Sequence, residues 1–469
     1  MTAPTTSNGR NGRAPDVRGK QVLVYSLGLE GRDLARWLMA NGARVTMSDT
    51  RDTAALAAAA ASPPPGVERV VVGEPLVDPA GFDLVAIAQS VLRHDPAVVR
   101  ARQLGIPVVS HMQLFLQVCP GRVVGISGSS GKTTTTALVG AMAAEAGLRH
   151  LVGGNIGEPL LSRLEEVDEG TTVILEISHT QLQFTDKSPA IAAITNITPN
   201  HLDQFGWDEY VGLKRNLLAF QSNGDIAVLN ADDSTSRVLM AAVPGTLART
   251  SLLGDPGGDG AWLEPGEVVG RIDGQTRRLL RPEVIHLRGQ HNTANVVMAA
   301  AVAAFAGIAP PAIERAVADF RGVPHRLEPV GSAHGVSYVN DSIATSPERT
   351  AAALRSFDDR IVLLLGGREK HLPLEALADL VRQRCRAVVC FGEAAGLFAA
   401  SMAGAGVDVQ RVGGLEQAVS AAARLARSGD VVLLSPAGNS FDAYPNFEGR
   451  GEAFRALVRA LPGFQEVQP

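Results

Sequence analysis

The stretch Arg122–Val139, RVVGISGSSGKTTTTALV, decides the fold of this chain. Its first five residues have the apolar character of a short buried strand, and from Thr134 onward the pattern is that of a helix. Between them, Gly128 and Gly131 permit backbone conformations that turn successive N–H groups toward an anion at the helix N-terminus. A strand, a glycine-rich turn and a helix in this order predict a phosphate-binding loop.

Two side chains of this loop suit a nucleoside triphosphate. Lys132 brings a mobile positive charge to the outer phosphates, and the Thr133 hydroxyl is placed to bind Mg²⁺. Ile126 stands where the general phosphate-loop pattern has its first glycine, but the shorter SGSSGKTT form is a more specific signal than that pattern. The alternative, a Ser/Gly turn with an incidental lysine, is disfavoured because a strand precedes the turn and a helix follows it. The predicted ATP-phosphate cradle consists of Gly128, Ser129, Ser130, Gly131, Lys132, Thr133 and Thr134.

Composition narrows the class of protein. The 469 residues suffice for about three domains of roughly 150 residues each. A net charge of −5 with dispersed Lys and Arg argues against nucleic-acid binding. The three cysteines, Cys119, Cys385 and Cys390, form no CxxC pair, which is typical of a reducing compartment and of neither a disulfide framework nor a zinc site. The expected location is the cytoplasm.

No segment has the pattern of a membrane span or a secretory signal. The longest apolar run, 296–309, is shorter than the about 20 residues that a bilayer requires. Residues 1–18 are polar and lack a hydrophobic period, so we expect a disordered tail.

A βαβ pattern follows the tail. Strands are predicted at 21–25 and 43–48, with a helix at 31–40 between them. The turn 26–31, SLGLEG, matches the dinucleotide-binding fingerprint except that serine replaces its first glycine, and Asp49 lies where a ribose-binding acid would be. This signal is weak alone: NAD, another nucleotide and a tight turn without ligand all stay open.

Polar residues end the strands of the predicted central sheet. Glu176 is the last residue of the strand 172–176, and His201 lies just past the strand 190–195. Because the carboxyl ends of parallel strands line the ligand crevice, both side chains should face the phosphates. We predict that Glu176 binds Mg²⁺ and that His201 contacts metal or phosphate; a solvated strand-end acid and a structural histidine are the alternatives.

Lys214 is the most informative lysine. In a predicted helix at 208–222, Tyr210, Leu217 and Leu218 form one apolar stripe, and Lys214 lies in its middle. Such a lysine either snorkels along the helix surface or is directed into the active site, where its amine could be modified or paired with charge. We favour the second interpretation.

The remaining sequence predicts a small β-layer and a third α/β domain. Residues 250–287 alternate short strands with Gly and Pro turns and are expected to flank the central sheet. On the next predicted helix, Asn292 and Asn295 share a face, so their amides could read a base edge. From Val323 strands and helices alternate again. We expect the tail, the first, the central and the third domain at 1–18, 19–119, 120–322 and 323–469.

Ten or so motifs, in order, resemble those of the Mur ligase family, ATP-dependent amide-forming enzymes of peptidoglycan synthesis. They cover nearly the whole chain after the tail and read GISGSSGKTT, VGGNIG, LEIS, NITPNHLDQF, YVGLK, NADD, QHNTAN, PHRLE, NDSIAT, LLGGREK and SPAGNSFDAYPNFEGRG. The resemblance is strongest to members that add D-glutamate to UDP-N-acetylmuramoyl-L-alanine. It implies this activity through an acyl phosphate, with ATP and two Mg²⁺ ions, in a cytoplasmic monomer that acts on small molecules, and not on nucleic acid or membranes.

The resemblance also implies a fold and a role for each matching residue. The fold is α/β with three domains: a Rossmann-like first domain, a central phosphate-loop ATPase-type domain with a small β-layer, and a Rossmann-like C-terminal domain. The implied catalytic residues are Lys132, Glu176, His201 and Lys214. The implied metal ligands are Thr133, Glu176, His201 and Lys214, the last as a carbamate. Further ATP contacts are Asn292, Asn295, Arg326 and Asp341. UDP-muramoyl contacts are Leu29, Glu30, Asp49, Thr50, Arg51 and Asn155. Glutamate contacts are Thr345, Lys370, Ser440, Phe441 and Phe447.

Three stretches depart from the family pattern. Ile343 stands where many relatives have lysine, Ala88-Gln-Ser90 replaces the usual SPG turn, and His179 and Gln183 replace commoner residues after Glu176. These departures bear on the muramoyl contacts and the metal geometry more than on the reaction class.

Other functions remain alternatives. Within the same chemistry these are an L-glutamate-adding ligase and a folylpolyglutamate synthetase, the second disfavoured by the complete nucleotide-type domain before the phosphate loop. An ATP-dependent switch protein would not need Glu176, His201 and an inward Lys214. An NAD oxidoreductase built on the first domain is weakened by Ser26.

Overall fold

The chain forms two compact units. The computed structural model describes residues 15–50, 59–73, 76–155, 159–199, 205–287, 289–369 and 373–466. The first unit comprises Met1–His286 and Gln290–Ala318, and the second comprises Leu287–Gly289 and Asp319–Pro469. No helix among the described residues is long and apolar enough to cross a membrane.

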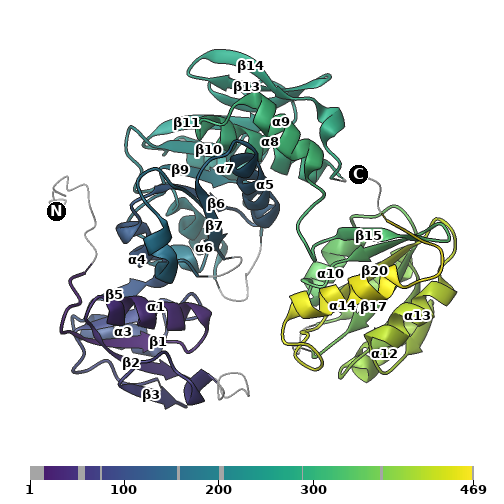
Figure 1. Cartoon of the computed structure of the whole chain (residues 1–469), viewed down its shortest axis with the longest axis horizontal. Helices are drawn as coiled ribbons and strands as arrows, with labels where there is room; N and C mark the ends of the chain where they lie inside the picture. Colours follow the sequence, from purple (N-terminus) through teal and green to yellow (C-terminus); the bar gives the residue numbers. More distant parts are fainter. Residues whose placement is uncertain are drawn as a thin grey trace. The chain divides into compact units, whose positions relative to one another are not determined.

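The first unit begins with a five-stranded parallel sheet in the order β3-β2-β1-β4-β5 (Figure 1). Its strands are β1 (Gln21–Tyr25), β2 (Arg44–Asp49), β3 (Arg69–Val72), β4 (Leu84–Ile87) and β5 (Val108–Ser110). Its helices are α1 (Leu29–Ala40), α3 (Pro96–Gln103) and α4 (His111–Val118). The strand order reverses between β1 and β4, and ligands of open α/β sheets bind at such a point.

The expected disordered tail is wrong at its C-terminal end. Val17 is 3% exposed and packs in the core of the first unit. The turn that follows is closed by a bond from the Lys20 N–H to the Val17 carbonyl. A single valine beside a turn has no hydrophobic period, so the pattern did not reveal it. Residues 1–14 lie outside the described residues.

A nine-stranded sheet forms the centre of the first unit, in the order β14-β13-β12-β11-β10-β9-β6-β8-β7. The neighbours from β7 to β12 pair in parallel, and β12, β13 and β14 pair antiparallel. The segment predicted as a small β-layer flanking the central sheet is part of that sheet at one edge, because β12 pairs directly with β11. The strands are β6 (Arg122–Ser127), β7 (His150–Gly154), β8 (Thr172–Glu176), β9 (Ile191–Ile194), β10 (Ile226–Asn230), β11 (Thr246–Ser251), β12 (Gly260–Glu264), β13 (Glu267–Ile272) and β14 (Gln275–Leu280).

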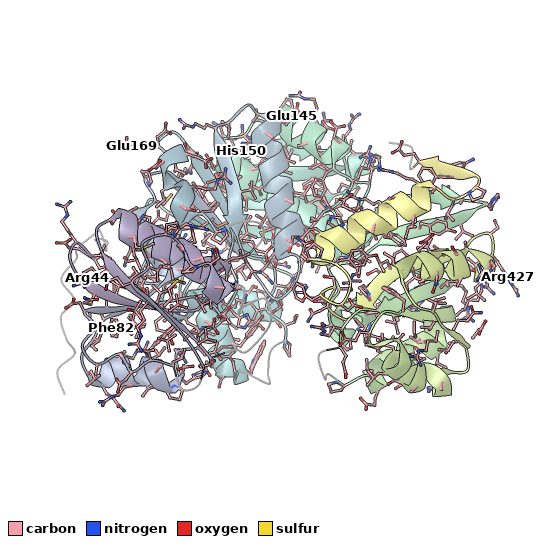
Figure 2. All side chains as sticks on the ribbon, turned by 60° about the horizontal axis from the view of Figure 1, so that its bottom comes forward. Arg44, Phe82, Glu145, His150, Glu169 and Arg427 are labelled. Atoms are coloured by element: carbon pink, nitrogen blue, oxygen red, sulfur yellow. The ribbon has the colours of Figure 1, made fainter. Side chains whose placement is uncertain are left out.

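Helices α5 and α8 pack against each other beside this sheet. Figure 2 marks Glu145 at the end of α5 and His150 at the start of β7, the two ends of the turn that leads back into the sheet. The core of the unit continues from the first sheet into the central one, so the two domains are packed together. The helices are α5 (Lys132–Glu145), α6 (Trp207–Arg215), α7 (Ser234–Met240), α8 (Gln290–Phe305) and α9 (Pro310–Asp319), with short 3₁₀ turns η1 (Leu161–Glu166), η2 (Gln181–Gln183) and η3 (Pro282–Val284).

Helix α6 ends earlier than the predicted 208–222. After Arg215 bonds that span three residues appear, from the Leu217 N–H to the Lys214 carbonyl and from the Leu218 N–H to the Arg215 carbonyl. The chain tightens into turns, yet Tyr210, Lys214, Leu217 and Leu218 are all buried. The stripe and the start of the helix were therefore predicted correctly, although the end of the helix was not.

The second unit is a seven-stranded sheet in the order β19-β18-β17-β20-β16-β15-β21, covered on both faces (Figure 1). Helices α10, α11 and α12 share one core with the sheet, and α13 and α14 share another. The strands are β15 (Glu328–Ala333), β16 (Val336–Asn340), β17 (Ile361–Gly366), β18 (Cys385–Phe391), β19 (Asp408–Arg411), β20 (Val431–Ala437) and β21 (Phe464–Glu466). The helices are α10 (Pro347–Leu354), α11 (Glu375–Arg384), α12 (Ala395–Met402), α13 (Leu415–Leu425) and α14 (Phe447–Arg459), with η4 at Ala403–Ala405.

Candidate functional site

The phosphate loop joins β6 to α5 and requires glycine at two positions. Gly128 and Gly131 have φ of 147° and 81°. A Cβ on Gly128 would lie 2.0 Å from the Thr195 Oγ1, and one on Gly131 would lie 2.2 Å from the Asn295 Oδ1. Neither position therefore has room for a side chain. The first N–H groups of α5 have no acceptor within the helix, so this tight loop presents an anion site.

The segment after β9 is hydrogen-bonded to the phosphate loop. The Ser129 N–H donates to the Asn196 carbonyl (2.9 Å), and the Ser130 N–H donates to the Asn196 Oδ1 (3.1 Å). The Thr195 hydroxyl donates to the Ser130 carbonyl (2.6 Å). The Ser129 hydroxyl donates to the Thr198 carbonyl (2.9 Å) and lies 3.0 Å from the Tyr210 hydroxyl. These bonds fix the loop before any ligand arrives.

Two lysines meet at one carbonyl of this loop. The Lys132 Nζ donates to the carbonyls of Gly128 (3.0 Å) and Ser129 (3.1 Å). The Lys214 Nζ, from α6, donates to the Gly128 carbonyl (2.9 Å) and to the Ser127 Oγ (3.0 Å). Thr133 and Thr134, in the first turn of α5, are buried beside them.

The burial of Lys214 changes its chemistry. Its side chain is 1% exposed, and its ammonium lies over the Tyr210 ring, 5.5 Å from the centroid. Burial lowers the pKa of Lys214 well below 10.5, and the charge of Lys132 lowers it further, while Glu176 opposes the shift. The burial therefore shifts Lys214 toward its neutral amine form.

Glu176 ends β8 beside the phosphate loop and suits a cation. In the sheet it pairs with Ile126 of β6 and Gly154 of β7. Its Oε1 accepts a bond from the Asn155 Nδ2 (2.7 Å), but its Oε2 is buried without a hydrogen-bond partner. A buried carboxylate oxygen without a donor is unfavourable, and a bound Mg²⁺ would satisfy it.

The structure thus brings Lys132, Glu176 and Lys214 together at the phosphate loop, with Thr133 beside them. Among the described residues, no three His, Cys, Asp or Glu side chains form a ready metal cluster. His201, predicted as a ligand, lies outside the described residues.

The two predicted adenine-side amides start α8. The Asn295 Nδ2 donates to the Asn292 Oδ1 (3.2 Å), so the two side chains share a face as predicted. The Asn295 amide also abuts the loop at Gly131. The sequence-distant α8 therefore starts against the phosphate loop.

The first domain offers a second turn at a helix N-terminus. Ser26 has φ of 132°, and a Cβ on Gly31 would lie 2.0 Å from the Ser26 carbonyl, so the strand and α1 approach closely. The Asp49 Oδ2 accepts a bond from the Leu27 N–H (2.9 Å) and stabilises this turn. Leu29 is 72% exposed at the start of α1. Thr50 is half-buried after β2, and Arg51 lies outside the described residues.

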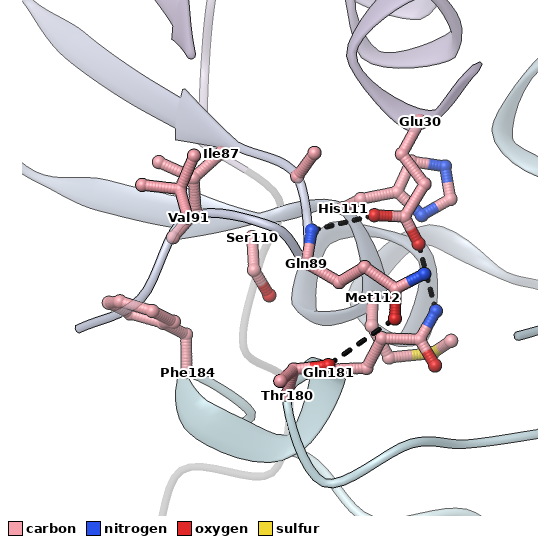
Figure 3. A pocket seen from close by; sticks show the side chains of 11 residues that line it. Glu30, Ile87, Gln89, Val91, Ser110, His111, Met112, Thr180, Gln181 and Phe184 are labelled. Atoms are coloured by element: carbon pink, nitrogen blue, oxygen red, sulfur yellow. Dashed lines mark hydrogen bonds between the residues drawn. The ribbon is translucent and has the colours of Figure 1, made fainter. Parts of the chain in front are cut away.

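Two side chains of the predicted UDP-muramoyl set are directed away from this turn, although Glu30 itself belongs to it. Asn155 is bonded to Glu176, beside the candidate metal position. Glu30 points to the junction with the central domain, where it lines a narrow pocket with Gln89, His111 and Gln181 (Figure 3). The predicted set is therefore spread over the first domain, the junction and the central sheet.

In the second unit, Asp341 follows β16 and contacts β20 and the segment before β15. Its Oδ2 accepts a bond from the Ser435 hydroxyl (2.8 Å), and its Oδ1 accepts one from the Leu327 N–H (3.2 Å). Burial raises the pKa of Asp341 to about 7. Two further predicted contacts are half-buried on the neighbouring loops. These are Arg326, predicted to contact ATP as Asp341 is, and Thr345, predicted to contact glutamate.

The predicted glutamate residues belong to the same edge of this sheet. Backbone bonds join Arg368 and Asn439 in both directions, so the loops after β17 and β20 lie together. Ser440 is buried, Phe441 is 59% exposed, and Phe447 begins α14. Lys370 lies outside the described residues.

Arg450 on α14 ties these loops together and was not predicted. Its guanidinium is fully buried and donates to the Ser342 Oγ (3.0 Å), the Ser342 carbonyl (2.9 Å) and the Gly438 carbonyl (3.0 Å). Burial lowers its pKa to about 10. Arg450, Phe454 and Val458 recur every four residues on one buried stripe, the signal that had identified Lys214.

Two family matches cover the central and C-terminal parts of the chain. Residues 126–303 match the Mur ligase middle domain, and residues 325–438 match the Mur ligase glutamate ligase domain.

Curated proteins named UDP-N-acetylmuramoylalanine–D-glutamate ligase are similar over nearly the full length. The protein from Symbiobacterium thermophilum is 38% identical over 447 residues, which are 94% of this chain and 98% of that protein. The protein from Koribacter versatilis is 38% identical over 457 residues, with 95% and 98% covered. The protein from Acetivibrio thermocellus is 35% identical over 459 residues, with 95% and 97% covered.

Solved structures share the fold at lower identity. A UDP-N-acetylmuramate–alanine ligase from Thermotoga maritima gives a TM-score of 0.55 at 19% identity, with 93% of this chain and 98% of that chain covered. A pseudomurein peptide ligase type C from Methanothermus fervidus gives 0.53 at 18% identity, with 94% and 99% covered. These likenesses establish the three-domain α/β architecture.

Proposed function

The chain belongs to the Mur ligase family, and on that premise we propose that it joins D-glutamate to UDP-N-acetylmuramoyl-L-alanine, converting ATP to ADP and phosphate, in peptidoglycan precursor synthesis. The observation that carries the proposal is the group of Lys132, Glu176 and Lys214 at the C-terminal end of β6, in which Glu176 and Lys214 are buried. The similarity to D-glutamate ligases over 94% of the chain selects the substrates.

The chemistry needs a site that handles negative charge. A carboxylate is a poor electrophile, so the γ-phosphoryl group is transferred to the alanine carboxylate, which gives an acyl phosphate and ADP. The glutamate amine then attacks the acyl carbon, the C–O bond to phosphate breaks, and the amine loses a proton. Lys132 and the N–H groups at the start of α5 stabilise the charge on the transferred phosphoryl group.

Mg²⁺ would neutralise the phosphate charge when it is bound. The Thr133 hydroxyl and the orphan Oε2 of Glu176 are oxygen donors of the kind that Mg²⁺ prefers, so the residues present fit the ion. Binding there removes the unfavourable burial of an unpaired carboxylate oxygen. We propose two ions, with His201 and a modified Lys214 as further ligands.

The lowered pKa of Lys214 supports its modification to a carbamate. The neutral amine attacks CO₂, forms the N–C bond and releases one proton, so an amine becomes an anionic carboxylate. A lysine held as an ammonium would not react, because its lone pair is protonated. The carbamate would place a second anionic group beside Glu176 and give this position a negative charge.

The substrates are assigned to three domains. We propose that 19–119 binds the UDP part, that 120–322 binds ATP and the muramoyl part near Asn155, and that 323–469 binds glutamate. The buried cation Arg450 near the loops of Asp341 and Ser440 supports an acidic amino acid at that edge. We further propose that the chain is cytoplasmic and monomeric. Light scattering of the purified chain would test the monomeric state.

Product formation by the purified chain tests the activity. We expect ADP release that requires UDP-N-acetylmuramoyl-L-alanine, glutamate and Mg²⁺ together, measured with a coupled assay that omits each component in turn. D-glutamate should give the UDP-dipeptide product and L-glutamate should not, as detected by mass spectrometry. Equal ADP release without the muramoyl nucleotide would reject the ligase, and a preference for L-glutamate would reject the assigned stereochemistry alone.

A further inference from the structure

A buried segment connects the candidate metal site to the first domain. This junction segment, Ile177–Gln183, follows Glu176 directly and contains η2. Ser178, Gln181 and Gln183 are 8%, 2% and 8% exposed, which is unusual for such polar side chains. Buried polar side chains need partners, and several partners of this segment belong to the first domain.

Glu30 is the central partner in that domain. Its Oε1 accepts a bond from the Gln181 Nε2 (2.8 Å), and its Oε2 accepts one from the Gln89 N–H (2.7 Å) (Figure 3). Both oxygens of the carboxylate are thus bonded at the junction. Bonds to an ionised carboxylate are about twice as strong as bonds between neutral groups.

The orientation of Gln181 follows from its own contacts. Its Oε1 accepts a bond from the Ser178 N–H (3.0 Å), and its backbone N–H donates to the Ser178 Oγ (3.2 Å). Turning the amide over would place an oxygen against the Glu30 carboxylate and a donor against the Ser178 N–H. The Nε2 is therefore directed at Glu30.

Gln89 closes the arrangement into a ring. Its side-chain Oε1 accepts bonds from the hydroxyls of Ser178 (3.0 Å) and Thr180 (3.3 Å), while its N–H bonds to Glu30. The ring runs from Glu30 to Gln181, Ser178 and Gln89, and back to Glu30. Two of these residues come from each domain, so neither domain forms the ring alone.

The partners of Glu30 explain how a carboxylate is tolerated at this position. Glu30 lies in the first turn of α1, where a nucleotide diphosphate is expected, and an unpaired carboxylate there would repel it. The two donors turn this carboxylate toward the junction and reduce its effect on the anion site. Glu30 therefore suits the junction better than direct contact with the nucleotide.

We propose that Glu30 is a positioning residue: through its bond to Gln181 it fixes the position of the N-terminus of α1 relative to Glu176. The inference rests on the proposed function: the muramoyl nucleotide bound in the first domain must deliver its carboxylate to the γ-phosphate beside Glu176. Gln181 is five residues from Glu176, so a shift of the ring moves the metal-site strand end relative to the nucleotide. A misplacement of about 1 Å can reduce a rate by roughly 100-fold.

The test compares Glu30→Ala, Gln181→Ala and the double variant. We expect kcat to fall roughly 10- to 100-fold in each single variant, with little further loss in the double variant, because both remove the same link. The KM for ATP and the calorimetric Kd for the muramoyl nucleotide without ATP should stay within about twofold, because each domain keeps its own site. Glu68→Ala, which removes an exposed carboxylate of the same domain, should leave all constants unchanged.

Three outcomes would overturn the proposal. These are additive losses in the double variant, a changed Kd for the muramoyl nucleotide in Glu30→Ala alone, and unchanged kcat in both single variants. If either alanine variant fails to fold, Glu30→Gln keeps the side-chain volume and should show an intermediate loss of kcat. Wild-type protein without ligase activity would instead reject the proposed function, which separates the two failures.

Discussion

The phosphate-loop edge of the central sheet and the loop edge of the C-terminal sheet each contain a buried basic side chain. Lys214 on α6 is 1% exposed, and Arg450 on α14 is 0% exposed. Each donates to a serine hydroxyl and to a glycine carbonyl: Lys214 to Ser127 and Gly128, Arg450 to Ser342 and Gly438. For neither side chain does the structure record an ion pair with a carboxylate among the described residues.

The same burial has opposite chemical consequences at the two edges. Lysine loses its proton readily when buried, so burial shifts Lys214 toward the neutral amine, the form that would react in the proposed carbamate. Arginine has so high an intrinsic pKa that a value of about 10 still leaves Arg450 charged at neutral pH. One edge thus gains a reactive group, and the other gains a permanent cation that orders its loops. Four predictions test this comparison.

Lys214→Ala should have the largest effect on activity. We expect kcat to fall about 10²- to 10³-fold, because the variant loses the proposed carbamate from the metal site. Short carboxylates such as acetate should restore part of the rate to this variant by supplying the missing anion. Lys214→Arg should be equally inactive, since a guanidinium forms no carbamate.

The exposed lysine Lys20 provides the control for this prediction. Lys20→Ala should keep full activity and should not respond to acetate. ¹³C-labelled bicarbonate should give a carbamate signal in the wild type that is absent from Lys214→Arg. Full activity of Lys214→Arg would contradict the carbamate, because the positive charge alone would then suffice.

Arg450→Met should mainly destabilise the second unit. The change leaves the Ser342 and Gly438 carbonyls buried without donors, at a cost of about 1–3 kcal/mol for each unsatisfied group. Arg450→Lys should rescue little, because a single ammonium cannot reproduce the planar fork. Hydrogen exchange of β20 and α14 would measure the loss, and the KM for glutamate should rise more than the KM for ATP.

The exposed Arg427 gives a matched control for Arg450 (Figure 2). Arg427→Met removes the same charge from the same unit. It should leave the hydrogen exchange of β20 and α14 and the KM for glutamate unchanged. A rescue by Arg450→Lys to wild-type stability would show that charge alone, and not the three bonds, orders the loops.

Asp341 predicts a pH dependence of stability in the second unit. Its pKa is about 7 in the folded chain and 3.8 in the unfolded reference, so the folded state keeps a proton that the unfolded state loses. The stability contributed by this group is present below pH 3.8 and is lost as the pH rises through about 7. Asp341→Asn should therefore flatten the fall in melting temperature between about pH 4 and pH 7.

Asp408→Asn, on the edge strand β19, is the control for the pH experiment. It removes one carboxylate from the same unit without touching the buried loops, and its profile should follow the wild type. A wild-type melting temperature that rises steadily from pH 4 to pH 7 in the second unit, with no difference in Asp341→Asn, would contradict the raised pKa.

Much of the fold was predictable because alternating strands and helices have strong local patterns. The phosphate loop, the strand ending in Glu176 and the buried stripe with Lys214 all lie as the sequence indicated. The same period of four residues places Arg450, Phe454 and Val458 on one buried stripe, which a motif match by itself does not reveal.

Other features could not be read from local sequence. The ring of Glu30, Gln89, Ser178 and Gln181 joins residues up to 151 positions apart, and hydrogen bonds of that span leave no periodic signal. The early end of α6 reflects tertiary contacts, since the Asn216 side chain donates to the Leu182 carbonyl. The roles of His201 and Lys370 stay predictions, because both lie outside the described residues.

Tyr210→Phe should have the smallest effect and tests how Lys214 and the phosphate loop are linked. The Tyr210 hydroxyl lies 3.0 Å from the Ser129 Oγ, and its ring lies under the Lys214 ammonium. Phenylalanine keeps the ring and loses only the hydroxyl, so we expect a loss of about 1 kcal/mol, or roughly fivefold in kcat, because Ser129 still donates to the Thr198 carbonyl. Tyr444→Phe in the second unit should leave kcat unchanged. A loss as large as that of Lys214→Ala would mean that the hydroxyl, and not the buried amine, organises this edge of the sheet.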